Sequence, residues 1–174
     1  MINIPKRFEG AKYEDVPANI QALIENIAIS RKGIYIYSDC GTGKTHVAYA
    51  IAKKMDEDKF KVKFYNTTNL LKYLKEDFSE QSKLLSFDNT NYGLLLSYTG
   101  LLIIDDFGTE KMSEWVEETF YSLINKRYEE VLPTIFTSNL SPDKLTEKYG
   151  DRIVSRIIGS CDVIELTGSD KRLS

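Results

Sequence analysis

A short stretch in the first third of the chain combines residue types that bind phosphate groups. Residues 38–45 read Ser-Asp-Cys-Gly-Thr-Gly-Lys-Thr and lie between a β-branched and aromatic run and a segment with helical apolar spacing. Gly41 and Gly43 let backbone N–H groups turn toward a phosphate without a Cβ in the way, and a following helix adds the positive end of its dipole. Lys44 can reach the β- and γ-phosphates, and the Thr45 hydroxyl can ligate Mg²⁺. The stretch therefore predicts a P-loop that binds ATP and Mg²⁺.

The serine at position 38 departs from the P-loop template, G-x-x-x-x-G-K-[ST], which begins with glycine. If the turn requires a positive φ at Ser38, the strain would cost about 1–3 kcal/mol. A chance Gly-Lys-Thr in a turn is the competing interpretation, and the strand-loop-helix context argues against it. The residues predicted to contact the nucleotide are those of the loop and of the first helical turn: Asp39, Cys40, Gly41, Thr42, Gly43, Lys44, Thr45 and His46. For His46, packing or capping is favoured over catalysis.

A second motif places two acids directly after four apolar residues. Residues 101–104 read as a central parallel strand that is covered on both faces, and Asp105 and Asp106 follow it. We expect the Asp105 carboxylate to hold Mg²⁺ together with Thr45. Asp106 is predicted to point toward the γ-phosphate and to orient or deprotonate the attacking water. For the two acids taken alone, solvation of a strand end is the alternative.

The elements that must position these residues alternate along the chain. Short β-branched, aromatic or apolar runs predict strands at 33–38, 62–65, 101–104, 134–137 and 163–166. Apolar residues at helical spacing predict helices at 20–29, at 44–55, from Thr67 or Asn69 onward, in part of 79–98, at 142–149 and at 151–158. Ser113 is predicted to cap a long helix whose apolar stripe runs from Val116 to Val131, and Pro133 prevents its continuation.

Strands that alternate with helices indicate an α/β domain, here a three-layer sandwich around a mainly parallel five-stranded sheet. Residues 20–174 are predicted to form this core. Residues 1–19 are predicted to be an irregular entry segment, because Pro5 and Pro17 discourage regular structure.

Composition excludes several classes of protein. A net charge of -3 and a pI near 5.3 do not fit a strongly basic nucleic-acid binder, so any contact with DNA must come from a local patch. Two isolated cysteines are too few for a disulfide framework or a zinc site. The N-terminus lacks the apolar core of a signal peptide, and no apolar run approaches the roughly 18 residues that span a bilayer. We therefore expect a cytoplasmic protein without a membrane partner.

Four stretches together resemble the AAA+ ATPases of the DnaC/DnaI helicase-loader family. They are residues 41–46, 102–108, 133–140 and 151–156, and residues 4–8 are similar to the segment that enters this ATPase core. The likeness covers nearly the whole chain, and the order and spacing of the stretches carry it. It implies an AAA+ P-loop NTPase fold of the ASCE class with no separate lid domain. It also implies ATP hydrolysis in DNA replication, where the family assembles a replicative DnaB-type helicase on single-stranded DNA.

The resemblance implies further roles for polar residues outside the two motifs. Asn139 matches the sensor-1 position, whose amide helps Asp106 to place the water. Arg156 matches the arginine finger that reaches the ATP of a neighbouring subunit, which implies head-to-tail self-association. Arg152 lies on the same helix face and is expected to support Arg156. Arg172 is close to the position from which the family's sensor-2 arginine could be supplied. Without the family, Asn139 is equally a turn former and the arginines form a solvated basic face.

Two features bear on function: one departs from typical helicase loaders, and the other departs from most AAA+ ATPases. The loaders carry an N-terminal helicase-binding domain, whereas this chain has only the entry segment, so either it is a fragment or its partner docks elsewhere. Asp106 stands where most AAA+ ATPases have glutamate, a feature that the loader family shares, and its shorter reach predicts slow hydrolysis. Three lysines lie where the family contacts single-stranded DNA, with an ordinary charged helix surface as the equal alternative: Lys72, Lys75 and Lys83.

Two other functions stay open at this point. An IstB-type transposition helper shares the core and the P-loop, although such proteins usually have Ser-Gln where this chain has Ser138 and Asn139. A nucleotide-dependent interaction module with little turnover is the second.

Overall fold

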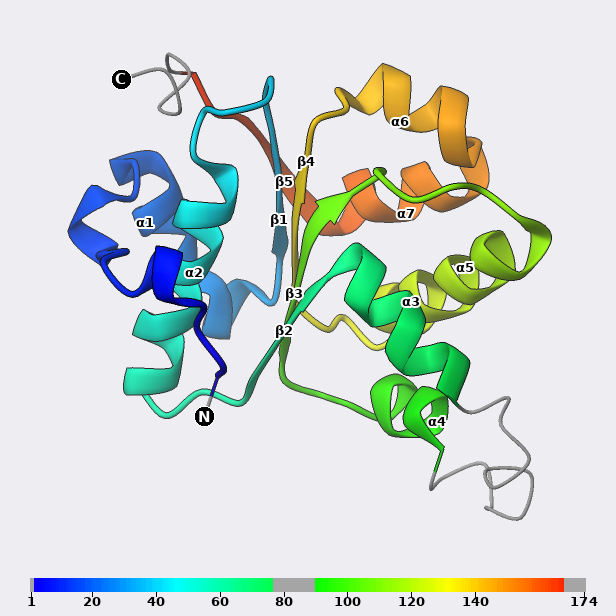
Figure 1. Cartoon of the computed structure of the whole chain (residues 1–174), viewed down its shortest axis with the longest axis horizontal. Coiled ribbons are helices and arrows are strands. Elements are labelled where there is room, and N and C mark those ends of the chain that lie inside the picture. Colours follow the sequence, from blue (N-terminus) through cyan, green and yellow to red (C-terminus); the bar gives the residue numbers. More distant parts are fainter. Residues whose placement is uncertain (1, 77–89, 168–174) are drawn as a thin grey trace.

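A parallel five-stranded sheet forms the centre of the computed structural model, which describes residues 2–76 and 90–167 (Figure 1). Its strands are β1 (Gly33–Tyr37), β2 (Val62–Asn66), β3 (Leu101–Phe107), β4 (Thr134–Ser138) and β5 (Cys161–Glu165). They are ordered β2-β3-β4-β1-β5, and every neighbouring pair is parallel. All the carboxyl ends therefore lie at one edge, where α/β proteins of this kind bind ligands. The predicted parallel α/β sheet is confirmed.

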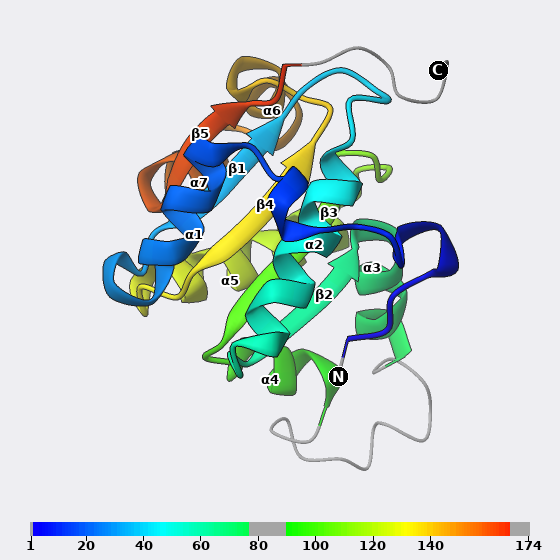
Figure 2. The same ribbon diagram turned by 90° about the vertical axis from the view of Figure 1, so that its left-hand side faces the viewer.

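Helices cover both faces of the sheet (Figures 1 and 2). On one face lie α1 (Ala18–Ser30) and α2 (Lys44–Glu57). On the other lie α3 (Thr67–Lys75), α4 (Asn91–Leu96), α5 (Glu114–Glu129), α6 (Pro142–Tyr149) and α7 (Asp151–Ser160). Two 3₁₀ turns, Lys6–Phe8 and Tyr13–Asp15, precede α1. The three-layer sandwich is as predicted, and the part of the 79–98 prediction at 79–89 lies outside the described residues.

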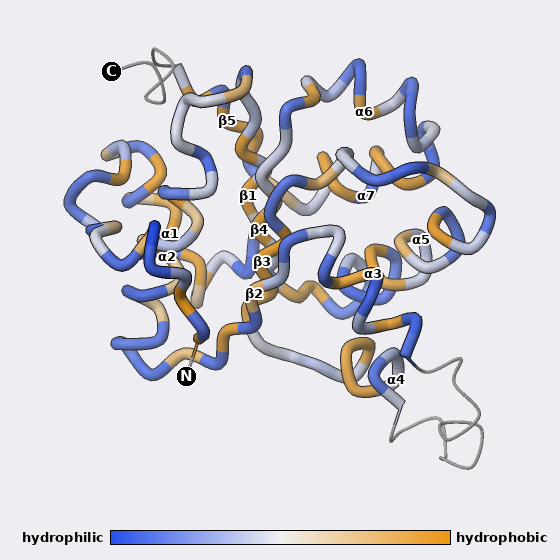
Figure 3. The backbone as a smooth tube through the Cα atoms, in the orientation of Figure 1, coloured by the Kyte–Doolittle hydropathy of each residue, from blue (hydrophilic) through white to orange (hydrophobic). Residues whose placement is uncertain are grey.

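The two helix layers bury separate apolar clusters against the sheet. Apolar residues concentrate along the strands in Figure 3, as expected for a sheet covered on both sides. The two central strands β3 and β4 show this clearly, because the first five residues of β3 and all five residues of β4 are buried. Phe107, Phe120 and Tyr149 belong to the cluster under α3–α7, whereas Ile36, Ile51 and Ile103 belong to the cluster under α1 and α2.

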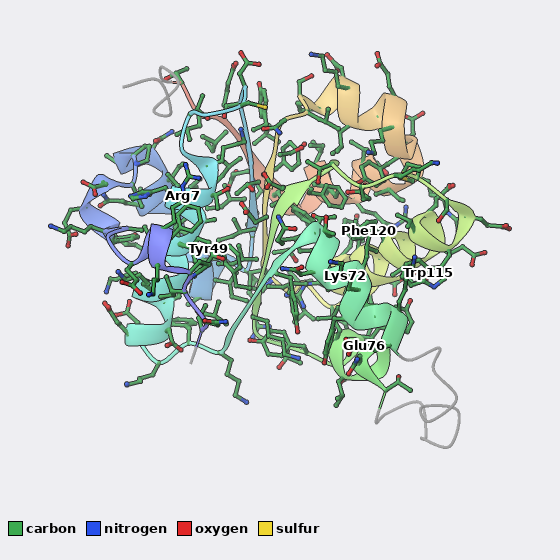
Figure 4. All side chains as sticks on the ribbon, in the orientation of Figure 1. Arg7, Tyr49, Lys72, Glu76, Trp115 and Phe120 are labelled. Carbon is green, nitrogen blue, oxygen red and sulfur yellow. The ribbon has the colours of Figure 1, made fainter. Side chains whose placement is uncertain are left out.

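The entry segment packs against α2. Ala11 and Val16 are buried in the cluster of the α2 face, and the rings of Phe8 and Tyr49 stack with centroids 4.7 Å apart. Lys53 Nζ on α2 donates to the Ala11 carbonyl at 2.8 Å. Figure 4 places Arg7 and Tyr49 on this side of the sheet, opposite Lys72, Trp115 and Phe120. The segment is thus more ordered than its prolines indicated, while its division from the core at residues 1–19 stays a prediction.

Helix α5 begins as predicted but ends earlier. The Ser113 side chain accepts a hydrogen bond from the Val116 N–H at 3.3 Å, which confirms the cap. The predicted stripe wrongly includes Val131, which follows the helix end with φ 51° and is 57% exposed. Leu132 N–H donates to the Arg127 carbonyl at 2.8 Å, a bond that closes the helix through a left-handed residue and turns the Val131 side chain outward.

Arg127 ties α5 to the loops that enter β3 and β4. Its side chain is only 3% exposed. Nε donates to Thr134 Oγ1 at 2.7 Å, Nη1 to the Tyr98 carbonyl at 2.9 Å, and Nη2 to the carbonyls of Gly100 and Pro133 at 2.8 Å each. Burial lowers the pKa of Arg127 to about 10. The guanidinium therefore satisfies three carbonyls and one hydroxyl inside the protein.

Among the described helices, none combines the length and the apolar character that a bilayer span requires.

Candidate functional site

The predicted P-loop connects the carboxyl end of β1 to the N-terminus of α2. Gly41 and Gly43 adopt φ angles of 85° and 100°, a region that costs glycine little. Ser38 is not among the described residues with positive φ, so the strain considered for it is absent. Its hydroxyl lies 2.5 Å from Thr42 Oγ1 and accepts from Lys44 Nζ at 3.1 Å. Serine at the first template position thus braces the loop from inside.

Lys44 lies inside the loop and is 5% exposed. Its Nζ donates to the carbonyls of Ser38 at 2.8 Å and Asp39 at 2.7 Å. Burial lowers the pKa of Lys44, while Cys40 and the nearby aspartates raise it. Within the described chain, no side chain caps the N-terminus of α2, whose N-cap is Gly43. The first N–H groups of α2 therefore face the loop with the positive end of the helix dipole.

Asp105 meets the P-loop at the carboxyl end of β3. The residue is 2% exposed, and its Oδ1 accepts a hydrogen bond from Thr137 Oγ1 at 2.5 Å. Burial raises the pKa of Asp105 to about 6; hydrogen bonds from Thr137 and Thr45 and the charge of Lys44 act in the opposite direction. These effects of Thr45 and Lys44 on Asp105 show that the two predicted motifs lie close together. The loop and the strand end converge as the sequence indicated.

Asp106 is held in an unusual backbone conformation beside Asp105. Its φ is 56°, and the pairing of β3 with β4 is irregular between Ile104 and Phe107. Its N–H donates to Thr137 Oγ1 at 3.0 Å, and Asn66 Nδ2 donates to its Oδ2 at 3.3 Å. Strand β3 continues past the predicted end at residue 104, and its pairing with β4 is irregular at the two acids.

Two residues of this site were not predicted. Thr137, fully buried in β4, bonds both Asp105 and Asp106, and Asn66, at the end of β2, bonds Asp106. Both are polar residues at the carboxyl end of a strand, which is the signal that could have identified them. Their assignment required the order of the strands, because β2 and β4 flank β3 in the sheet.

The predicted residues outside the motifs lie in different places. Asn139 follows β4 directly and is half-buried, so it stands at the same sheet edge as the acids. Arg152 and Arg156 lie on α7, across the sheet from α2. Arg172 lies outside the described residues. Cys40 is exposed in the loop.

The two arginines of α7 pack on α5. The guanidinium carbon of Arg152 lies 3.7 Å from the ring centroid of Tyr121, and that of Arg156 lies 5.1 Å from it. Arg156 Nε also donates to Asn125 Oδ1 at 2.6 Å. A cavity of about 320 Å³ opens beside Arg152 and is lined by residues of α5 and of the α6–α7 junction: Glu114, Glu117, Glu118, Tyr121, Tyr149, Arg152 and Ile153.

The lysines proposed to contact DNA differ in their surroundings. Lys72 is exposed on α3, and Lys75 Nζ lies 5.0 Å from the ring centroid of Trp115 on α5. Lys83 lies outside the described residues.

The residues at the edge of the sheet fit a magnesium nucleotide. Thr45 and Asp105 supply a hydroxyl and a carboxylate, the hard oxygen ligands that Mg²⁺ prefers. In residues 2–76 and 90–167, no three His, Cys, Asp or Glu side chains are grouped to hold a metal by themselves. This donor set suits an ion that keeps several waters and shares phosphate oxygens, as Mg²⁺ does in P-loop proteins.

Replacing Asp105 with asparagine is expected to stabilise the nucleotide-free protein at neutral pH. Because the folded carboxyl has a raised pKa, the native state binds more protons than the unfolded state between about pH 4 and pH 6. The stability of the wild type therefore falls as pH rises through this window and stays lower above it. The uncharged asparagine side chain escapes this cost, worth about 3 kcal/mol at pH 7.5, and the gain disappears near pH 4.

Urea unfolding of both proteins from pH 4 to pH 8 measures this difference. Asp39→Asn, which changes an exposed acid of the P-loop, serves as the control and should show no comparable gain. Equal stability of Asp105→Asn and wild type at pH 7.5 would contradict the prediction.

Comparisons with known proteins agree with this geometry. A model of the IstB-like ATP binding protein family matches residues 18–174. The replicative helicase loader DnaI of Bacillus subtilis (strain 168) is 28% identical over 154 residues, which are 81% of this chain and 48% of DnaI. The chromosomal replication initiator protein DnaA of Spiroplasma citri is 30% identical over 132 residues, 71% of this chain and 27% of DnaA. The chain thus spans half or less of the length of these relatives.

Solved structures show the same fold. A crystal structure of DnaI superposes with a TM-score of 0.75 at 25% identity and covers 98% of this chain and 95% of that one. The crystal structure of the DnaC helicase loader gives 0.72 at 24% identity, over 94% of this chain and 100% of the other. The structure of replication initiator DnaA bound to AMPPCP and single-stranded DNA superposes with a TM-score of 0.75 at 22% identity. The match covers 92% of this chain and 51% of that one.

Proposed function

Since this chain belongs to the family of IstB-like ATP-binding proteins, we propose that it is a slow Mg²⁺-dependent ATPase of the helicase-loader type. In this proposal it assembles a replicative DnaB-type helicase on single-stranded DNA in the cytoplasm. The observation that carries the ATPase part is the convergence of Thr45 and Lys44 with Asp105 and Asp106 at one sheet edge. The likeness to DnaI over 81% of the chain supports the loader part.

Each residue at this edge has a distinct task in the proposal. The P-loop amides and Lys44 bind the phosphates, and Thr45 and Asp105 hold Mg²⁺, which neutralises charge on the phosphate oxygens. Asp106 accepts a proton from the attacking water, and Asn139 at the neighbouring strand end orients that water. The short side chain of Asp106 limits its reach. A basal turnover on the order of hundreds per second would refute the proposed slow hydrolysis.

Arg156 serves a neighbouring subunit in this proposal, with Arg152 beside it. Both lie on α7, on the face of the sheet opposite α2. A subunit whose P-loop meets α7 of the next one makes a head-to-tail contact, which generates a ring or an open helix. A guanidinium there neutralises charge that develops on the γ-phosphate during hydrolysis. Arg172 is proposed to contact the nucleotide as well, on the family resemblance alone.

Asp106→Asn and Arg156→Ala are each expected to lower ATP hydrolysis by about 100-fold, because each removes a group that acts in the transition state. An equal mixture of the two variants should regain roughly a quarter of the wild-type rate, since random neighbours pair an intact Asp106 with an intact Arg156 at that frequency. Steady-state phosphate release with single-stranded DNA measures both effects. Lys126→Ala, an exposed change on α5, is the control. A mixture no faster than its components contradicts sharing between subunits.

Co-purification with a replicative helicase, with and without ATP, tests the loader part. We expect ATP-dependent capture of the helicase and its transfer to circular single-stranded DNA. The IstB name of the matching family keeps a transposition helper as the second candidate. ATP-dependent binding to a transposase, with no binding to the helicase, would favour that function. Nucleotide binding without hydrolysis, with or without DNA, would leave an interaction module.

A further inference from the structure

The four residues after Asp106 are the last residue of β3 and the turn that follows it, and they are fastened to the end of α6. We call residues 107–110 the hook. Within it, Gly108 adopts φ 97°, and its N–H donates to Glu110 Oε2 at 3.2 Å. The Thr109 hydroxyl donates to the Asp106 carbonyl at 2.8 Å. The hook is therefore bonded to itself and to the peptide group of Asp106.

Glu110 is the central residue of the hook. It is 9% exposed, and its Oε1 accepts a hydrogen bond from the Tyr149 hydroxyl at the end of α6. Burial, and then the charge of Glu110, raise the pKa of Tyr149, so its hydroxyl keeps the proton that it donates. A buried carboxylate that accepts from a backbone N–H and a phenol fixes both partners, because releasing either would leave a buried polar group without a partner.

Lys148 fastens the same turn from outside. Its Nζ donates to the carbonyls of Gly108 and Glu110 at 2.6 Å each and lies 3.7 Å from Glu110 Oε1. Two successive residues of α6, Lys148 and Tyr149, therefore both bond to the hook. Since α7 begins at Asp151, the same junction also fixes the start of the helix that carries Arg152 and Arg156.

Phe107, the first residue of the hook, connects these contacts to the end of β3. The ring of Phe107 stacks on Tyr149 with centroids 4.7 Å apart and planes 5° apart. Its carbonyl accepts from Ser138 Oγ at 2.6 Å, next to Asn139. A Cβ atom on Gly108 would lie 2.7 Å from Leu140 Cδ1, so this turn has little room to move. Tyr149 thus contacts residues on both ends of the hook.

Asp106 needs support of this kind because of its backbone. A φ of 56° is uncommon outside glycine, and residues held in this region persist where the surroundings over-determine them. Asn66 and Thr137 hold Asp106 from the strands on either side. The hook holds the chain that leaves it. Loss of the hook would let Asp106 relax toward an ordinary backbone conformation and would turn its carboxylate away from its present direction.

We propose that Glu110, clamped by Tyr149 and Lys148, is a positioning residue that aims the Asp106 carboxylate at the attacking water. This inference rests on the proposed ATPase function. It assigns the hook to the hydrolytic step and not to nucleotide binding, because none of these contacts involves the P-loop. The junction of α6 and α7 that holds the hook also precedes the arginines of α7. The same contacts would therefore position both Asp106 and the arginines that the proposal places at the ATP of a neighbouring subunit.

Single-turnover hydrolysis with excess protein tests the proposal, together with titration of a fluorescent ATP analogue. Glu110→Ala is expected to lower the hydrolytic rate constant on the order of tenfold, while the dissociation constant of the nucleotide changes by less than about twofold. Tyr149→Phe keeps the ring stack and should lose about threefold by the same route. In an Asp106→Asn background, Glu110→Ala should have no further effect, because it acts through Asp106.

Three results would overturn the inference: an unchanged rate, a parallel loss of nucleotide affinity, or an equal loss in the Asp106→Asn background. Glu117→Ala removes an exposed acid near Tyr149 as the matched control and should leave the rate unchanged. If Glu110→Ala does not fold, Tyr149→Phe decides by the same comparisons. A wild-type protein that binds ATP but never hydrolyses it would instead overturn the proposed function, and the inference with it.

Discussion

Lys44→Ala is expected to weaken ATP binding by about 100-fold, or about 2.7 kcal/mol. The ammonium group is the cation that the proposal places on the β- and γ-phosphates, and charge-assisted bonds to phosphate are among the strongest in proteins. The substitution also removes the donor that crosses the loop to the carbonyls of Ser38 and Asp39. Isothermal titration with ATP and Mg²⁺ measures the loss.

Lys54→Ala is the matched control for this experiment. Lys54 lies on the same helix with its side chain 37% exposed, and it pairs with Asp58 one turn further on. Its removal should leave the affinity for ATP unchanged. Equal affinities for Lys44→Ala and the wild type would show that residues 38–45 do not hold the triphosphate, and the proposed function would fail.

Arg127→Met is expected to destabilise the fold by about 3 kcal/mol. Methionine fills much of the same space, but the carbonyls of Tyr98, Gly100 and Pro133 lose their buried donor. Relief of the desolvated charge offsets part of this cost, which is why the loss stays below the sum of four broken hydrogen bonds. Urea unfolding measures the change, and Tm should fall on the order of 10 °C.

Two further variants separate charge from geometry at this position. Arg127→Lys keeps a cation but has no planar fork to reach acceptors on two loops, so it should recover only part of the loss. Lys126→Met removes the exposed neighbour and should change stability by less than about 0.5 kcal/mol. If Arg127→Met were as stable as the wild type, the network would be of no consequence for the fold.

The sheet could be predicted from the sequence because its signals are local. Each strand is a short apolar or β-branched run, and Ser113 marks the start of α5 in the sequence itself. The errors also have local physical causes. Strand β3 extends to Phe107 because β2 and β4 pair with it beyond Ile104, where the apolar run of the sequence ends. Val131 lies outside α5 because a left-handed turn closes that helix.

The site was predicted only where its residues follow each other in the chain. The P-loop and the acids of β3 are contiguous motifs. Thr137 and Asn66 bond those acids from the neighbouring strands, and Glu110 bonds the turn that follows them. Their contacts depend on strand order and on an irregular register, which no single segment encodes. The roles assigned to Asn139, Arg152 and Arg156 stay predictions.

The contact between the hydroxyl groups of Ser38 and Thr42 inside the P-loop has a consequence for the energetics of nucleotide binding. Ser38 and Thr42 hold the loop in a curved form, and Lys44 is already drawn to its centre. The entropy of ordering these residues is therefore lost during folding and not at the encounter with the nucleotide. Preorganisation of this kind favours rapid association. When the nucleotide binds, Lys44 exchanges its two carbonyl acceptors for phosphate oxygens. The net enthalpy of binding is therefore smaller than the new contacts alone would give.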